Sequence, residues 1–225
     1  MYNEKRSAIA KKKFGQNFLH NITILEKISE AMPSEYEIIE IGPGLGDLTR
    51  RLVAKKEVTA YEIDTDLVSR LLVTFNDEIT QGKLRLVVGD VMEIWGESLT
   101  KSPYAIVANL PYYIATAIIL RALRDSMCRV LVVMVQKEVA QKFCAKVGNS
   151  EYSSLSVLTQ IVGEGEILFD VPPECFDPAP KVMSSVIKIT KSVQNEWDES
   201  FAIFLSKAFQ SPRKTLIKNL GQSFP

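Results

Sequence analysis

A glycine-rich turn between a predicted strand and a predicted helix constrains the fold of this chain more than any other feature. Residues 37–41 read EIIEI, which favours a strand; residues 42–46 read GPGLG, and a helix is predicted to begin at Asp47. Glycine adopts backbone angles that other residues resist, and it leaves no side chain between the chain and a ligand. The stretch therefore predicts a strand-turn-helix unit with a nucleoside lying on its backbone.

A carboxylate stands where such a unit needs one. Glu62 directly follows the next predicted strand, Val58 to Tyr61, twenty residues after Gly42. From that position an acidic side chain hydrogen-bonds a ribose. The pattern fits dinucleotides and S-adenosylmethionine alike, and glycines of this kind also occur in plain tight turns of α/β proteins. The ligand is left open at this point.

Predicted strands and helices alternate through most of the chain, which favours a parallel sheet covered on both faces. The last two strands flank a proline-rich loop, residues 172–180, so they should form an antiparallel hairpin at the edge of the sheet. The predicted strands are 37–41, 58–61, 84–88, 104–108, 130–135, 167–171 and 182–189, and the predicted helices are 22–32, 47–55, 64–75, 116–123, 137–146, 155–161 and 197–209. The fold class is thus α/β, with a seven-stranded, mostly parallel sheet.

Polar or glycine residues follow four successive predicted strands. Gly42, Glu62, Asp90 and Asn109 each stand at a strand end. Each could be an ordinary turn residue. In a parallel sheet, however, ligands bind beyond the carboxyl ends of the strands, so the four together predict one shared cleft.

The segment after the fourth of these strands, Asn109-Leu110-Pro111-Tyr112, suits methylation of an exocyclic base amine. An asparagine oxygen and a backbone carbonyl can accept the two amine hydrogens and so favour the transition state. Proline stiffens the loop, and the aromatic ring can stack on a base that has left its helix. A plain turn before a helix is the alternative interpretation.

Composition narrows the class of protein. With 225 residues, 46% of them hydrophobic, the chain can build one sizeable α/β core. His20 is the only histidine, and the three cysteines form no CxxC pair, so we expect no metal site and no disulfide framework. No apolar run is long enough for a bilayer, and residues 1–13 lack the apolar centre of a secretory signal, so we expect a cytoplasmic protein without a membrane partner.

Charge is balanced overall but concentrated as lysine and arginine at both ends. Residues 1–25 contain five basic residues against one acid, and residues 200–225 contain four basic residues and no acid. Basic ends predict contact with a polyanion, and solvated tails are the alternative.

Several motifs together resemble the ribosomal RNA adenine dimethyltransferase family of KsgA/RsmA type. The glycine motif is shared by many methyltransferases, whereas the N-terminal GQNFL, the NLPYYI and the proline-rich segments are more specific. The motifs are GQNFL (15–19), EIGPGLG (40–46), YEID (61–64), GD (89–90), NLPYYI (109–114), VPPECFDPAPKV (171–182) and SPRKTLIKNL (211–220).

The resemblance implies a Rossmann-like class I methyltransferase that uses S-adenosylmethionine to dimethylate two adjacent adenosines near the 3′ end of small-subunit ribosomal RNA. It implies a monomer whose catalytic domain, with an N-terminal RNA- and donor-binding segment, spans residues 1–190. Residues 191–225 would begin a small helical domain that is truncated here. The implied donor contacts are Asn17, Leu19, Gly42, Gly44, Glu62, Asp90, Val91, Met92 and Asn109, and the implied target-base contacts are Asn109, Leu110, Pro111, Tyr112 and Phe176, with Tyr112 and Phe176 sandwiching the base.

Three alternatives remain. An enzyme of the erythromycin-resistance type would methylate large-subunit RNA, and a ribosome-assembly factor would bind RNA without catalysis. A DNA adenine methyltransferase is disfavoured by the GQNFL and FDPAPKV segments. The chain also departs from the family at His20-Asn21, where an acid is usual.

Overall fold

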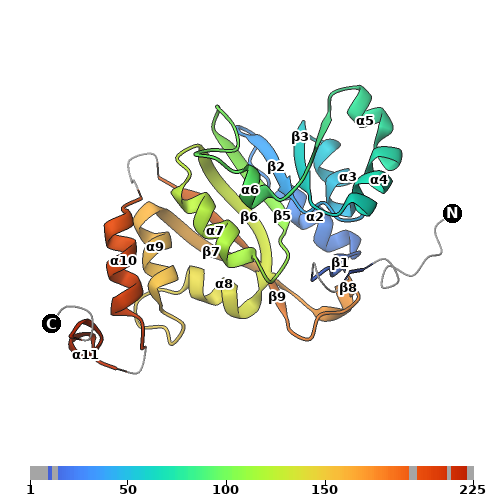
Figure 1. The fold of residues 1–225 in the computed structure, drawn as a ribbon. Coiled ribbons are helices and arrows are strands. Elements are labelled where there is room, and N and C mark those ends of the chain that lie inside the picture. The colour runs from blue at the N-terminus through green and yellow to red at the C-terminus, as the bar shows by residue number, and fades with distance from the viewer. Residues whose placement is uncertain (1–9, 12–14, 193–196, 212–213, 222–225) are drawn as a thin grey trace.

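A seven-stranded mixed sheet forms the centre of the molecule (Figure 1). The computed structural model describes residues 10–11, 15–192, 197–211 and 214–221. Strand order is β4-β3-β2-β5-β6-β9-β7; the first five are parallel, and β9 and β7 run antiparallel to their neighbours. The predicted sheet with its antiparallel edge hairpin is confirmed. The strands are β2 (Glu37–Ile41), β3 (Val58–Glu62), β4 (Leu84–Val88), β5 (Tyr104–Asn109), β6 (Cys128–Gln136), β7 (Gly163–Val171) and β9 (Ser184–Lys191).

Helices cover both faces of the sheet, because the central strands are apolar on both sides. In β5, Ile106 and Ala108 belong to the core cluster that also contains residues of α6 to α9, whereas Ala105 and Val107 belong to a second cluster that contains residues of α2 to α4. The helices are α2 (Ile22–Glu30), α3 (Asp47–Val53), α4 (Thr65–Thr74), α5 (Asn76–Thr80), α6 (Val91–Ile94), α7 (Ala115–Arg124), α8 (Lys137–Cys144), α9 (Ser154–Val162), α10 (Glu199–Ala208) and α11 (Leu216–Leu220), with a 3₁₀ turn, η2, at Pro173–Cys175.

A second, two-stranded sheet joins segments far apart in the sequence. Strand β1 (Phe18–Leu19) pairs antiparallel with β8 (Phe176–Asp177), and the two lie side by side at the N-terminal side of the molecule (Figure 1). Phe18 and Leu19 are both buried. The sheet fixes the chain before α2 against the loop between β7 and β9, and sequence periodicity did not predict it.

Two large apolar side chains of the amphipathic helices α2 and α10 are exposed. Ile22 of α2 is 59% exposed and Phe201 of α10 is 38% exposed. Ile22 is the first residue of its helix, directly after the Asn21 cap, and the core begins one turn later at Leu25. Phe201 instead stacks on Phe204, with 5.8 Å between ring centroids, at the surface of α10.

A buried polar cluster closes the amino-terminal edge of β5 and β6. The Asp125 carboxylate accepts hydrogen bonds from Trp95 Nε1 at 2.9 Å and from the Tyr104 hydroxyl at 2.7 Å. Lys191 Nζ donates to the Asp125 carbonyl at 2.6 Å and to the Ala122 carbonyl at 3.0 Å. Since each of these groups is paired, the cluster stabilises the fold at the edge opposite the strand carboxyl ends.

Candidate functional site

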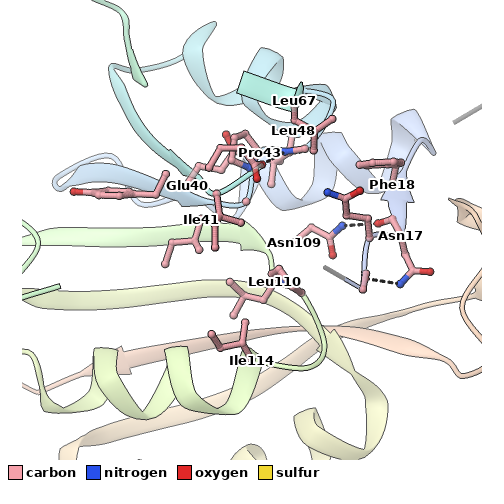
Figure 2. Close-up of a pocket in the computed structure, with 18 of the residues that line it drawn as sticks. Asn17, Phe18, Glu40, Ile41, Pro43, Leu48, Leu67, Asn109, Leu110 and Ile114 are labelled. Carbon is pink, nitrogen blue, oxygen red and sulfur yellow. Dashed lines mark hydrogen bonds between the residues drawn. The ribbon is translucent and has the colours of Figure 1, made fainter. Parts of the chain in front are cut away.

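A cleft opens at the carboxyl ends of β2, β3, β4 and β5. This is the edge where ligands bind in open α/β sheets. Residues 15–19, here called the N-terminal wall, line one side of it, and Figure 2 shows Asn17 and Phe18 of this segment. Eleven of the predicted site residues line the cleft together: Asn17, Leu19, Gly42, Gly44, Glu62, Asp90, Val91, Asn109, Leu110, Pro111 and Tyr112. The four strand-end positions therefore share one cleft, as predicted.

The glycine turn leaves its backbone bare toward the cleft. Gly42 and Gly44 have φ angles of 70° and 62°, in the left-handed region that favours glycine. A Cβ at Gly44 would also lie 3.3 Å from the Phe18 ring. Both conformation and packing therefore require glycine at this position.

Backbone amides hold the carboxylate of Glu62 in place. Oε2 accepts from Gly44 N at 3.1 Å, and Oε1 accepts from Asp64 N at 2.9 Å. The side chain is buried, and this burial raises the pKa of Glu62. Each oxygen keeps a second lone pair, so the fixed carboxylate can accept from a pair of neighbouring hydroxyls.

Asp90 ends the loop after β4 and caps helix α6. Its Oδ1 accepts from Met92 N at 2.8 Å, which leaves Oδ2 as an acceptor for a ligand donor. Val91 follows and is buried against the cleft. Met92, which was expected beside the donor, does not line the cleft, and its partly buried side chain packs against the hydrophobic core.

The amide of Asn109 has a fixed orientation. Its Nδ2 donates to the backbone carbonyl of Asn17 at 3.2 Å, and the Asn17 side chain donates to the Gly15 carbonyl at 3.1 Å (Figure 2). With the nitrogen so engaged, Asn109 presents its oxygen to the cleft as an acceptor. The N-terminal wall therefore orients the polar group at the end of β5.

The residues after Asn109 form a rigid turn. Leu110 N donates to the Met134 carbonyl at 3.2 Å, and the Pro111 carbonyl accepts from Ala115 N at 3.0 Å. The Tyr112 hydroxyl lies 2.6 Å from Ser184 Oγ, and burial raises the pKa of Tyr112, so the ring is held as a neutral phenol. The Tyr112 ring and the Asn109 amide therefore line the same cleft.

Phe176, unlike the other residues expected to contact the target base, does not line the cleft. It is 3% exposed and lies in the core with Leu25 and Val171. Its backbone pairs with Leu19 across β1 and β8, which turns the ring toward the core. In this structure Phe176 supports the N-terminal wall by pairing with Leu19 and by lying in the same core cluster as Leu19.

Glu40, Gln16, Ile63 and Tyr113 also line the cleft and were not predicted. Glu40 is 1% exposed, its Oε2 has no hydrogen-bond partner in the described part of the chain, and burial raises its pKa to about 8. Glu40 could have been predicted from the sequence, because a carboxylate in a strand that is covered on both faces must be buried. Tyr113, 61% exposed at the mouth of the cleft, directly follows the predicted Tyr112.

The basic N-terminal cluster is only partly within the described residues. Lys12 and Lys13 lie outside them. Lys11 Nζ lies 2.5 Å from Asp64 Oδ1 and 2.6 Å from Asp66 Oδ2, so its charge is neutralised within the protein. Lys11 is therefore a poor candidate for contact with a polyanion.

The described residues contain neither a candidate metal site nor a helix that could span a membrane. They contain no group of three or more histidine, cysteine, aspartate or glutamate side chains arranged to hold a metal ion. No helix in the described ranges is both long and apolar enough to span a membrane.

Comparison with known proteins agrees with this geometry. A ribosomal RNA small subunit methyltransferase A of Aliarcobacter butzleri is 52% identical over 219 residues, covering 96% of this chain and 83% of that protein. Among solved structures, a dimethyladenosine transferase from Plasmodium falciparum is 28% identical with a TM-score of 0.74, covering 90% of this chain and 74% of that one. The 23S rRNA methyltransferase ErmE is 25% identical with a TM-score of 0.75, covering 93% and 85%.

A sequence model described as "Ribosomal RNA adenine dimethylase" matches residues 8–225, nearly the whole chain. With half-identical relatives, a shared fold and a cleft built from the predicted strand ends, the chain belongs to the ribosomal RNA adenine dimethylase family.

Proposed function

We propose that this protein transfers methyl groups from S-adenosylmethionine to the N6 amines of two adjacent adenosines near the 3′ end of small-subunit ribosomal RNA. The observation that carries the proposal is the fixed amide of Asn109, whose oxygen faces the same cleft as Glu62 and Asp90. The carboxylates of Glu62 and Asp90 suit a methyl donor that contains a nucleoside, and the oxygen of Asn109 suits an exocyclic amine.

The residues of the cleft fit the donor. Glu62 would accept the ribose hydroxyls, and Asp90 Oδ2 would accept the adenine amine beside Val91. The unpartnered Oε2 of Glu40 is an acceptor suited to the ammonium of the methionine part, close to the bare backbone of Gly42. When bound, S-adenosylmethionine supplies an electrophilic methyl group on a sulfonium.

The chain's own part in the reaction is to orient the amine. Asn109 Oδ1 and the Leu110 carbonyl would accept its two hydrogens, so that the nitrogen lone pair turns out of conjugation toward the methyl group. Tyr112, held by Ser184, would stack on the target base after the base leaves its RNA stack. Phe176 could take the opposite face of the base only if its ring left the core.

The choice of small-subunit RNA rests on sequence similarity. The half-identical relative is a small-subunit enzyme, whereas ErmE, a 23S rRNA methyltransferase, is 25% identical. The intact acceptors Glu62, Asp90 and Asn109 disfavour a factor that binds RNA without catalysis.

The test is to incubate undermethylated small subunits with labelled S-adenosylmethionine and to map the product by primer extension. We expect a stop at two adjacent adenosines near the 3′ end. Isolated large subunits and the Asn109→Ala variant are the controls. Label in large-subunit RNA alone would favour the erythromycin-resistance type, and no label in either subunit would favour the assembly factor.

Three further assignments belong to this proposal. Residues 1–190 would form the catalytic domain, and residues 191–225, which include α10 and α11, would begin a small helical domain. The protein would act as a monomer, and an enzyme of ribosomal RNA would act in the cytoplasm. Size-exclusion chromatography with light scattering tests whether the protein is a monomer, and cell fractionation tests whether it lies in the cytoplasm.

A further inference from the structure

The N-terminal wall must be held in place for the cleft to exist. Gly15, Gln16, Asn17, Phe18 and Leu19 all line it, and the Asn17 carbonyl orients Asn109. A shift of this segment would therefore change both the donor pocket and the acceptor for the target amine.

One end of the N-terminal wall is held by main-chain pairing. Leu19 pairs with Phe176 across β1 and β8, and His20 N donates to the Cys175 carbonyl at 3.0 Å. This fixes the wall next to the proline-rich loop. The other end, at Gly15 and Gln16, belongs to no strand or helix and depends on side chains.

Gln16 is fixed at both ends of its side-chain amide. Nε2 donates to Asp64 Oδ2 at 3.1 Å, and Oε1 accepts from the backbone N–H of Lys11 at 2.7 Å. Lys11 also contacts the carboxylate of Asp64 through its side chain, with 2.5 Å between Nζ and Oδ1. Lys11, Gln16 and Asp64 therefore form a closed triangle of contacts.

Asp64 connects this triangle to the donor site. It is 2% exposed, and its backbone N–H donates to Glu62 Oε1 at 2.9 Å. Burial acts to raise the pKa of Asp64, but the bonds from Lys11 and Gln16 outweigh burial and hold the pKa below its usual range. A buried charge with specific partners is costly to leave unpaired, so the contact should persist in solution.

We propose that Asp64 is a positioning residue: through Lys11 and Gln16 it holds the N-terminal wall against the donor pocket, and so sets the affinity for the donor and the orientation of Asn109. Asp64 does not line the cleft itself. The inference rests on the proposed donor site and adds a role for residues that need not touch the donor.

The informative substitution is Asp64→Asn. Asparagine caps a helix as well as aspartate does, so the bond to Asp66 N that begins α4 is kept. The ion pair with Lys11 is lost, and an amide NH2 replaces the oxygen that accepts from Gln16 Nε2. Lys11→Met removes the same ion pair from the other side. Lys146→Met is the matched control, because it removes a lysine from the exposed pair with Glu164.

Affinity for S-adenosylhomocysteine, the demethylated donor, is measured by calorimetry, and hydrogen exchange of residues 15–19 is followed by mass spectrometry without ligand. We expect Asp64→Asn and Lys11→Met each to weaken binding about tenfold and to speed exchange in the N-terminal wall. The double variant should bind much less than a hundredfold more weakly than the unaltered protein, because both substitutions break the contact between Lys11 and Asp64. Lys146→Met should bind like the unaltered protein.

Other outcomes overturn the inference. Unchanged affinity in Asp64→Asn with only a lower melting temperature would mean that the triangle merely stabilises the fold. Effects that multiply to about a hundredfold in the double variant would mean that the two residues act separately. If the unaltered protein did not bind S-adenosylhomocysteine, the donor site itself would be wrong, whereas binding by the unaltered protein with no loss in either variant would leave that site standing.

Discussion

Replacing Glu40 by glutamine should remove a pH dependence from the stability of the ligand-free protein. Glu40 is buried, and its pKa is raised from 4.5 to about 8. Between these two values the native state holds one proton that the unfolded chain has lost. The free energy of unfolding therefore falls as pH rises, by about 1.4 kcal/mol per pH unit, or roughly 5 kcal/mol over the whole interval.

The assay is urea unfolding of both proteins without donor, from about pH 5 to about pH 9. Titration of every other group is common to both proteins, so it cancels in the difference between them. The stability of Glu40→Gln relative to the unaltered protein should rise with pH up to about 8 and then level off. The size of the difference at low pH depends on how the new amide packs. Two curves that stay parallel across the range would refute the argument.

Three further substitutions test the cleft and the fold. Asn109→Ala should lower kcat about 100-fold or more with little change in KM, because its oxygen acts in the transition state; a rise in KM alone would contradict that role. Tyr112→Ala should weaken RNA binding by about 1 to 3 kcal/mol, whereas Tyr112→Phe, which loses only the bond to Ser184, should bind nearly as well in a filter assay. Asp125→Ala should lower the free energy of unfolding by about 3 to 5 kcal/mol, since Trp95 and its neighbours lose their acceptor, but the folded variant should keep its kcat. A reduced kcat below the melting transition would show that this edge of the sheet influences the cleft.

The sheet was predictable because its signals are local. Each long strand is a run of apolar residues ended by a turn, and Gly42, Glu62, Asp90 and Asn109 stand at such ends. Parallel strands bring their carboxyl ends to one edge, so the shared cleft followed from strand order alone.

The N-terminal wall depends on partners that no local pattern reveals. Strand β1 has two residues, too few for a periodic signal. The role of Phe176 was expected from the family resemblance alone, and no local pattern indicated its pairing with Leu19. Lys11 counted as one of a basic cluster, yet its partner Asp64 lies 53 residues further along the chain. A count of charges cannot distinguish a paired lysine from a free one.

The pairing of β1 with β8 also bears on synthesis of the protein. A chain leaves the ribosome N-terminus first, so Phe18 and Leu19 emerge long before Phe176 and Asp177. Until β8 has been synthesised, β1 has no strand with which to pair, and the N-terminal wall lacks its main-chain support. A growing chain that still lacks β8 therefore holds an incomplete donor site, and the enzyme cannot become competent before Phe176 and Asp177 have been added.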